Sequence, residues 1–247
     1  MQLLTIEAPS GLKIYHKGPS LDQGALPTLF YFAISGQDSL LLDPYNQLIS
    51  SMDLSKIRAI SFDLPAHEGG ADPQKAVSVW AKELKSSPKY IDNFLELCLQ
   101  NIDYLIENKI CDPKHIATAG LSRGGLIAAH IAARQPYIHN LLGFAPLTTF
   151  KQLHEFENAE LASLNLEFII PKLIHKQVRF YVGNRDTRVG TESCFRFVHN
   201  LTEQAYTQGV RSPQVELILF PSIGHKGHGT PLNIFQDGAR WISSKLV

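Results

Sequence analysis

The sequence predicts an α/β protein with a doubly wound, mostly parallel sheet that is covered by helices on both faces. Residues 28–34 and 57–62 are continuous apolar runs, which are typical of parallel strands buried on both sides. Further apolar runs alternate along the chain with segments of helical periodicity, and this alternation favours right-handed strand–helix–strand crossovers. Ligands of such sheets bind beyond the carboxyl ends of the strands, so functional residues are expected directly after strands.

The remaining elements follow in order from local patterns. Two short apolar runs flank a Pro-Ser-Gly turn within residues 3–14 and predict a hairpin. Asp72-Pro73 is a helix-start signal, and residues 90–107 carry an apolar stripe at helical spacing. Later strands are predicted at 115–119, 140–145, 178–182 and 215–220, with helices at 126–134 and, after Thr230-Pro231, near the end of the sequence.

Composition narrows the functional classes. Lysine plus arginine equals aspartate plus glutamate at 23 each, so no net field attracts nucleic acid or an anionic membrane, and a small, near-neutral substrate is expected. The first residues show no signal-peptide pattern, and no apolar stretch approaches a membrane span. Three sparse cysteines, Cys98, Cys111 and Cys194, argue against a disulfide framework. A cytosolic protein without a membrane span is expected.

No repeat, low-complexity tract or linker interrupts the pattern, so residues 1–247 are expected to form a single domain. Residues 150–177 lie between two predicted strands without regular periodicity. They are a candidate cap insert over the site.

Residues 120–124 read Gly-Leu-Ser-Arg-Gly and match the pattern Gly-x-Ser-x-Gly. They fall between a predicted strand and a predicted helix, where a sharp turn with small neighbours lifts the serine hydroxyl above the sheet at a helix N-terminus. Motif and context together indicate that Ser122 is a nucleophile.

At this point the sequence resembles the α/β-hydrolase superfamily, particularly its small esterase and peptidase-like members, over about residues 28–246. The resemblance implies a catalytic triad in the chain order serine, acid, histidine, and it implies no cofactor and no metal. In this family the acid usually follows the next-to-last strand. Here that strand leads into Gly-Asn-Arg-Asp-Thr-Arg-Val at 183–189, similar to the family's Gly-x-x-Asp-x-x-Val pattern, and Asp186 takes the role of orienting acid.

The resemblance places the general base after the last strand. Gly224-His225 is similar to the family's common ending, so position favours His225 as the base. His228 follows three residues later and is the alternative. Metal binding by this His-x-x-His pair is not expected, because the segment is a glycine-rich loop without the glutamate of zinc-protease helices.

Acyl transfer needs two donors aimed at the developing oxyanion. The resemblance assigns the backbone N–H of Arg123, just after the nucleophile, as one donor. It assigns the other to the loop after residues 28–34, where Gln37 N–H is favoured, with Ser35, Gly36 and Asp38 as alternatives. A loop at residues 63–67 looks like the family's Asp-x-Pro-Gly-His segment, which lies outside the triad.

The resulting hypothesis is a serine hydrolase that cleaves an ester of a small acyl substrate through Ser122, Asp186 and His225 by way of an acyl-enzyme. Peptidase, lipase, thioesterase and acyltransferase activities use the same triad. A binding protein on the same fold is the alternative from another class, and it would show a broken triad. The sequence leaves the oligomeric state open.

Overall fold

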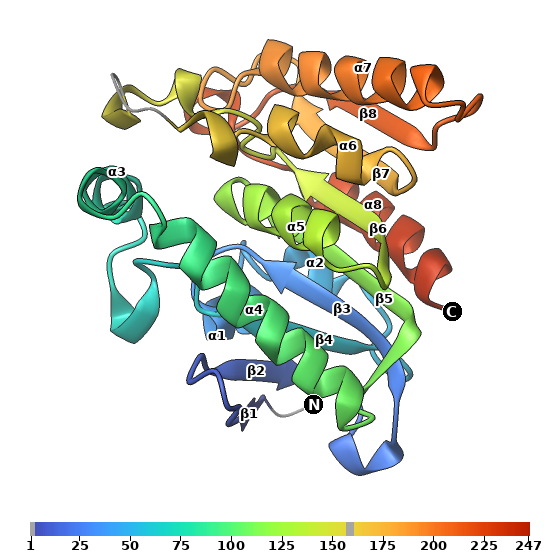
Figure 1. Cartoon of the computed structure of the whole chain (residues 1–247). Helices are drawn as coiled ribbons and strands as arrows, with labels where there is room; N and C mark the ends of the chain where they lie inside the picture. Colours follow the sequence, from blue (N-terminus) through green and yellow to red (C-terminus); the bar gives the residue numbers. More distant parts are fainter. Residues whose placement is uncertain (1–2, 157–160) are drawn as a thin grey trace.

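The computed structural model describes residues 3–156 and 161–247 and shows one eight-stranded sheet with helices on both sides (Figure 1). In spatial order the strands are β1 (Leu4–Ile6), β2 (Ile14–Lys17), β4 (Arg58–Phe62), β3 (Leu26–Phe32), β5 (Cys111–Leu121), β6 (Ile138–Phe144), β7 (Gln177–Gly183) and β8 (Val215–Phe220). β1 and β2 are antiparallel, and the strands from β4 to β8 are parallel. The predicted fold class is confirmed.

Two apolar clusters bury the two faces of the sheet. One contains residues of α3 (Ala76–Ser86), α4 (Tyr90–Glu107), α5 (Arg123–Arg134), α6 (Ile170–Leu173) and α7 (Thr191–Thr207). The other contains residues of α1 (Gly36–Leu41), α2 (Gln47–Ser50) and α8 (Leu232–Leu246) on the opposite face. Figure 1 shows α4 and α5 crossing in front of the central strands. The central strands are therefore dry on both faces, as their apolar runs predict.

The predicted elements match the observed ones with shifts at their ends. The helix predicted at 90–107 has those bounds, and its apolar stripe, including Phe94 and Cys98, is buried. The helix expected after Asp72-Pro73 begins only at Ala76, because Asp72 first forms a turn in which its Oδ1 accepts the N–H of Gln74. The helix expected at 126–134 begins earlier, at Arg123, directly after the motif serine.

The segment between β6 and β7 consists of short helical turns in its described parts: η3 (Phe150–Gln152), η4 (His154–Phe156), η5 (Ala162–Leu164), η6 (Leu166–Ile169) and α6. Residues 157–160 of the predicted cap insert at 150–177 lie outside the described residues. The cap role stays a prediction, as does the single-domain organisation of residues 1–247. Within the described ranges, no helix has the length and apolar character that a membrane crossing requires.

Candidate active site

Ser122 lies in a strained turn between β5 and α5. Its φ of 56° and ψ of −117° place a non-glycine residue in a region that L-amino acids rarely occupy. The turn is possible because glycines flank it: a Cβ on Gly120 would overlap the backbone of Gly124, and a Cβ on Gly124 would overlap the carbonyl of Phe32. The geometry presents the hydroxyl at the N-terminus of α5, at the carboxyl edge of the sheet.

Asp186 follows β7 and is fixed by its own loop. Its side chain is fully buried, and its Oδ1 accepts the backbone N–H groups of Arg188 at 2.9 Å and Val189 at 3.1 Å. The N–H of Asp186 itself donates to Thr191 Oγ1 at 2.9 Å. These bonds leave Oδ2 directed at a histidine ring.

That histidine is His228, not His225. His228 Nδ1 lies 2.7 Å from Asp186 Oδ2, and His228 Nε2 lies 2.9 Å from Ser122 Oγ. His225 is exposed at the edge of the same cavity, and its carbonyl accepts the backbone N–H of His228 at 3.1 Å. The prediction that His225 faces Ser122 is therefore corrected: the alternative, His228, occupies the position.

The loop after β8 explains the three-residue displacement. His225 begins the tight turn η7 (His225–Gly227), whose flanking Gly224 and Gly227 have φ values of 72° and 71°. Gly227 packs so closely against the acid loop that a Cβ would overlap the carbonyl of Arg185, and Thr187 N–H donates to Lys226 O at 2.9 Å. His225 is part of this turn, and the next histidine, His228, is the one that reaches Ser122. The pair of glycines around the turn is the sequence signal that could have indicated this.

The loop after β3 differs from the prediction. Gln37 is exposed in the first turn of α1 and does not line the cavity, because α1 begins at Gly36 and directs Gln37 outward. Ala33 and Ile34 line the cavity instead. Arg123 also lines it, and its N–H lies in the first turn of α5, where helical amides have no intrahelical acceptor.

Two residues that the sequence reasoning did not assign hold this loop. The buried Ser39 accepts the backbone N–H groups of Ala33 at 3.1 Å and Ile34 at 3.0 Å through its Oγ. Asp63 accepts the Gly36 N–H at 2.7 Å and the Tyr15 hydroxyl at 3.1 Å. Burial, followed by the Asp63 carboxylate, raises the pKa of Tyr15 to about 12, so the phenol stays a donor. No pattern in the sequence marks Ser39.

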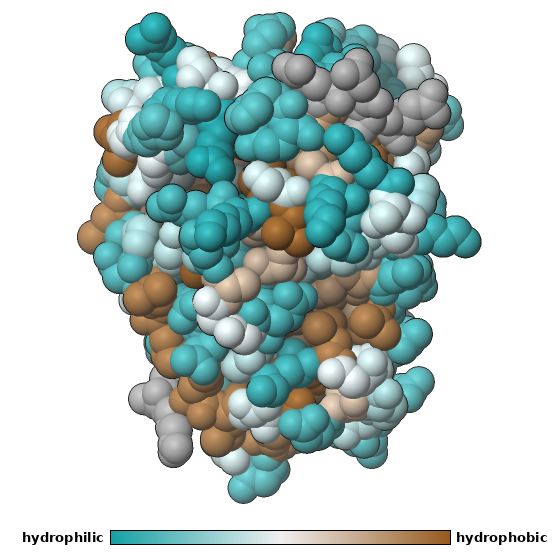
Figure 2. Space-filling view, turned by 90° about the vertical axis from the view of Figure 1, so that its left-hand side faces the viewer, coloured by the Kyte–Doolittle hydropathy of each residue, from teal (hydrophilic) through white to brown (hydrophobic). Residues whose placement is uncertain are grey.

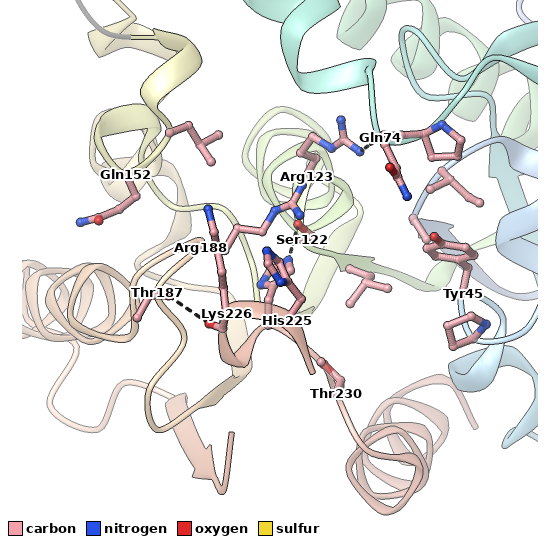
Figure 3. Close-up of a pocket in the computed structure, with 18 of the residues that line it drawn as sticks. Tyr45, Gln74, Ser122, Arg123, Gln152, Thr187, Arg188, His225, Lys226 and Thr230 are labelled. Atoms are coloured by element: carbon pink, nitrogen blue, oxygen red, sulfur yellow. Dashed lines mark hydrogen bonds between the residues drawn. The ribbon is translucent and has the colours of Figure 1, made fainter. Parts of the chain in front are cut away.

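Ser122 and His228 open into a cavity of about 730 Å³, within the usual range for small-molecule sites. Figure 2 looks onto this edge of the molecule, where apolar surface lies recessed among hydrophilic side chains. Figure 3 shows Ser122 with Arg188 and Lys226 on one side and Gln74, which precedes α3, on the other. Apolar walls come from Ala33, Ile34, Leu121, Leu153, Ile223 and Phe235. The walls can hold an acyl or alkyl group beside the hydroxyl.

Across residues 3–156 and 161–247, no group of three His, Cys, Asp or Glu side chains is arranged to hold a metal ion. Cys98, Cys111 and Cys194 are free and buried. Burial raises the pKa of each thiol, to about 12 for Cys111 and Cys194. The cysteines are therefore packing residues rather than nucleophiles.

Comparison with known proteins establishes the fold. TT1662 from Thermus thermophilus superposes with a TM-score of 0.70 at 17% identity, covering 100% of this chain and 99% of that one. The "Putative Dienelactone Hydrolase" of Klebsiella pneumoniae gives 0.66 at 16% identity, covering 99% and 98%. A puromycin-hydrolysing peptidase of Mycobacterium tuberculosis gives 0.67 at 15% identity, covering 99% of this chain but 39% of that one. At the sequence level, no family model and no curated protein matches.

The chain thus spans nearly the whole length of two of these structures and about two fifths of the peptidase. The identities are low, so the likeness concerns architecture: this chain has the α/β-hydrolase fold.

Proposed function

We propose that this chain is a serine hydrolase that cleaves carboxylic esters, with Ser122 as nucleophile, His228 as general base and Asp186 as the residue that orients the base. The observation that carries the proposal is the continuous contact from Asp186 Oδ2 to His228 Nδ1 at 2.7 Å and from His228 Nε2 to Ser122 Oγ at 2.9 Å. A binding protein without catalytic activity would need neither the Asp–His–Ser contact nor the strained backbone at the serine. Hydrolases among the structures that share the fold agree with the proposal.

The reaction follows from the positions of these atoms. Ser122 Oγ attacks the ester carbonyl carbon while its proton passes to His228 Nε2, giving a tetrahedral oxyanion. Collapse breaks the bond between the carbonyl carbon and the alcohol oxygen, and the imidazolium returns the proton to that oxygen. Water then donates its proton to His228 and adds hydroxide to the acyl carbon. Release of the carboxylic acid restores Ser122 with its proton.

The oxyanion needs donors at the helix start and in the loop after β3. We propose Arg123 N–H as one of them. We propose that the second donor comes from the loop after β3, which lines the cavity at Ala33 and Ile34, whereas Gln37 does not line it. The amides of Ala33 and Ile34 themselves donate to the buried Ser39 Oγ, and these two hydrogen bonds hold the backbone of the loop in place beside the cavity.

We propose a small acyl ester as the substrate, because the size and the apolar walls of the cavity suit a short acyl chain. We keep the cytosol as the proposed location, which the three free cysteines support.

Labelling with a fluorophosphonate probe, together with release of p-nitrophenol from p-nitrophenyl butyrate, tests the proposal. Wild type should label and turn over, and Ser122→Ala should do neither. Ser55→Ala is the matched control, because Ser55 is an exposed serine outside the cavity. An unlabelled, inactive wild type would remove the hydrolase proposal and favour the binding protein.

A further inference from the structure

Positive charge is concentrated in the cavity next to Ser122. Among the residues that the structure describes, three cationic side chains line it, Arg123, Arg188 and Lys226, against one carboxylate, Glu155. The chain as a whole carries 23 basic and 23 acidic residues and no net charge. A cavity wall with this excess of positive charge creates a local electrostatic field that attracts anions.

Arg188 is the cation that the acid loop contributes to the cavity. It lies two residues after Asp186, and its backbone N–H is tied to the Asp186 carboxylate at 2.9 Å, so the loop that fixes the acid also fixes the start of this side chain. Figure 3 shows the Arg188 side chain extending toward Ser122. Within the described residues its guanidinium forms no salt bridge and no side-chain hydrogen bond. Its donors are free for a ligand.

Arg123 lines the same cavity, and its charge adds to the same field. Its side chain is only 9% exposed, its Nη2 donates to the carbonyl of Pro73 at 3.2 Å, and its Nη1 is buried without a hydrogen-bond partner. Burial, followed by the charge of Arg188, lowers the pKa of Arg123 to about 10. The two guanidinium groups repel each other, and a bound anion would relieve that repulsion.

Within the described part of the wall, the carboxylate of Glu155 offsets only one of the three cationic charges. Glu155 lies 3.4 Å from His154 Nδ1, and its Oε2 forms no hydrogen bond in the described part of the chain. Asp186, close by, is fully buried and committed to His228 and to the two amides of its loop. Lys226, on the opposite loop, extends in the direction of the cavity in Figure 3. Over the described residues, the wall therefore carries more cationic than carboxylate side chains.

We infer that the substrate carries an anionic oxygen group, a carboxylate or a phosphate, which Arg188 binds with help from Lys226 while Ser122 attacks the ester carbonyl. This inference rests on the proposed hydrolase function and specifies its substrate class. It replaces the near-neutral substrate that the balanced overall charge of the sequence indicates.

Two esters of equal chain length test it: mono-p-nitrophenyl adipate, which ends in a carboxylate, and p-nitrophenyl hexanoate, which ends in a methyl group. Wild type should show the higher kcat/KM for the adipate ester. Arg188→Gln should lower the adipate-to-hexanoate ratio roughly tenfold or more, the usual loss for a hydrogen bond to a charged group. Arg188→Lys should lower it less, and Arg211→Gln, an exposed arginine outside the cavity, should leave it unchanged. Added salt should reduce the preference.

The outcomes separate the two proposals. Hexanoate cleavage with equal or lower kcat/KM for the adipate ester, a ratio that Arg188→Gln does not change, and no phosphate inhibition that depends on Arg188 would together overturn the anion inference and leave the hydrolase standing. A wild type that cleaves neither ester and takes no fluorophosphonate label would overturn both. Free adipate and inorganic phosphate are then used as competitors of hexanoate cleavage to identify the anionic group. Inhibition by either compound that is lost in Arg188→Gln supports the site. Inhibition by phosphate alone identifies the bound group of the substrate as a phosphate.

Discussion

His228 Nε2 lies 2.9 Å from Ser122 Oγ, although the two residues are 106 positions apart in the sequence. The contact depends on two loops that hold each other: the acid loop after β7 donates the Thr187 N–H to Lys226 O in the histidine loop at 2.9 Å. The base is therefore positioned by the acid's own loop, and changes on either loop are expected to reach Ser122.

Asp186→Asn should lower kcat for p-nitrophenyl butyrate by roughly a thousandfold or more, because an amide favours the wrong imidazole tautomer. The carboxamide oxygen can still accept the amides of Arg188 and Val189. Asp186→Ala should lose the same activity and, in addition, about 2 kcal/mol of unfolding free energy, because both amides lose their acceptor. Steady-state kinetics and urea unfolding of both variants measure this. Equal stability of the two variants would argue against the buried hydrogen bonds.

Ser122→Gly should be more stable than Ser122→Ala by about 1 kcal/mol, since glycine adopts a φ of 56° without the steric cost that a Cβ brings. Neither variant should hydrolyse esters. Thermal unfolding of the pair measures the difference. The control is the same pair of substitutions at Ser244 in the last helix, where the sign should reverse because glycine weakens a helix. An alanine variant at 122 that is as stable as the glycine variant would mean that the turn is unstrained.

Ser39→Ala should lower kcat roughly tenfold with a smaller effect on KM, because the loop that lines the cavity at Ala33 and Ile34 loses the hydroxyl that accepts its two amides and holds its backbone in place. It should also lower the free energy of unfolding by about 2 kcal/mol. Ser244→Ala, on the surface, is the matched control. Full activity of Ser39→Ala would show that the loop keeps its shape without this hydroxyl.

Buried His67 should make the protein less stable in mild acid. Burial, followed by the charge of Arg123, lowers the pKa of His67 from 6.5 to about 4. A histidine whose pKa is lowered on folding binds its proton better in the unfolded chain, so its contribution is complete above pH 6.5 and is lost as the pH falls toward 4. The loss is about 3 kcal/mol at 1.36 kcal/mol per pKa unit.

Urea unfolding at pH 7 and at pH 4.5 checks this for wild type and His67→Phe. The variant should lose less stability than wild type over that interval. His16, whose pKa burial also lowers to about 4, remains in both proteins and contributes equally. Parallel losses in the two proteins would contradict the buried, neutral state of His67.

The sequence predicted the sheet, the helices and two members of the Ser122–His228–Asp186 contact, because each leaves a local signal. Buried parallel strands are continuous apolar runs, and the serine turn needs glycines at fixed offsets. Which histidine acts as the base, and which residue supplies the second oxyanion donor, depends on contacts between loops that are distant in the sequence. Gly227 against Arg185, and Gly36 against Asp63, are contacts between distant segments that local patterns do not contain.

The histidine pair gives the most direct test of the central claim. Wild type, His228→Ala and His225→Ala are compared for fluorophosphonate labelling and for kcat on p-nitrophenyl butyrate, with urea unfolding to confirm that each variant is folded. The geometry predicts that His228→Ala loses labelling and at least a thousandfold in kcat, whereas His225→Ala keeps both within about a factor of ten. Loss of activity in His225→Ala, with an active His228→Ala, would contradict the assignment of His228 as the base.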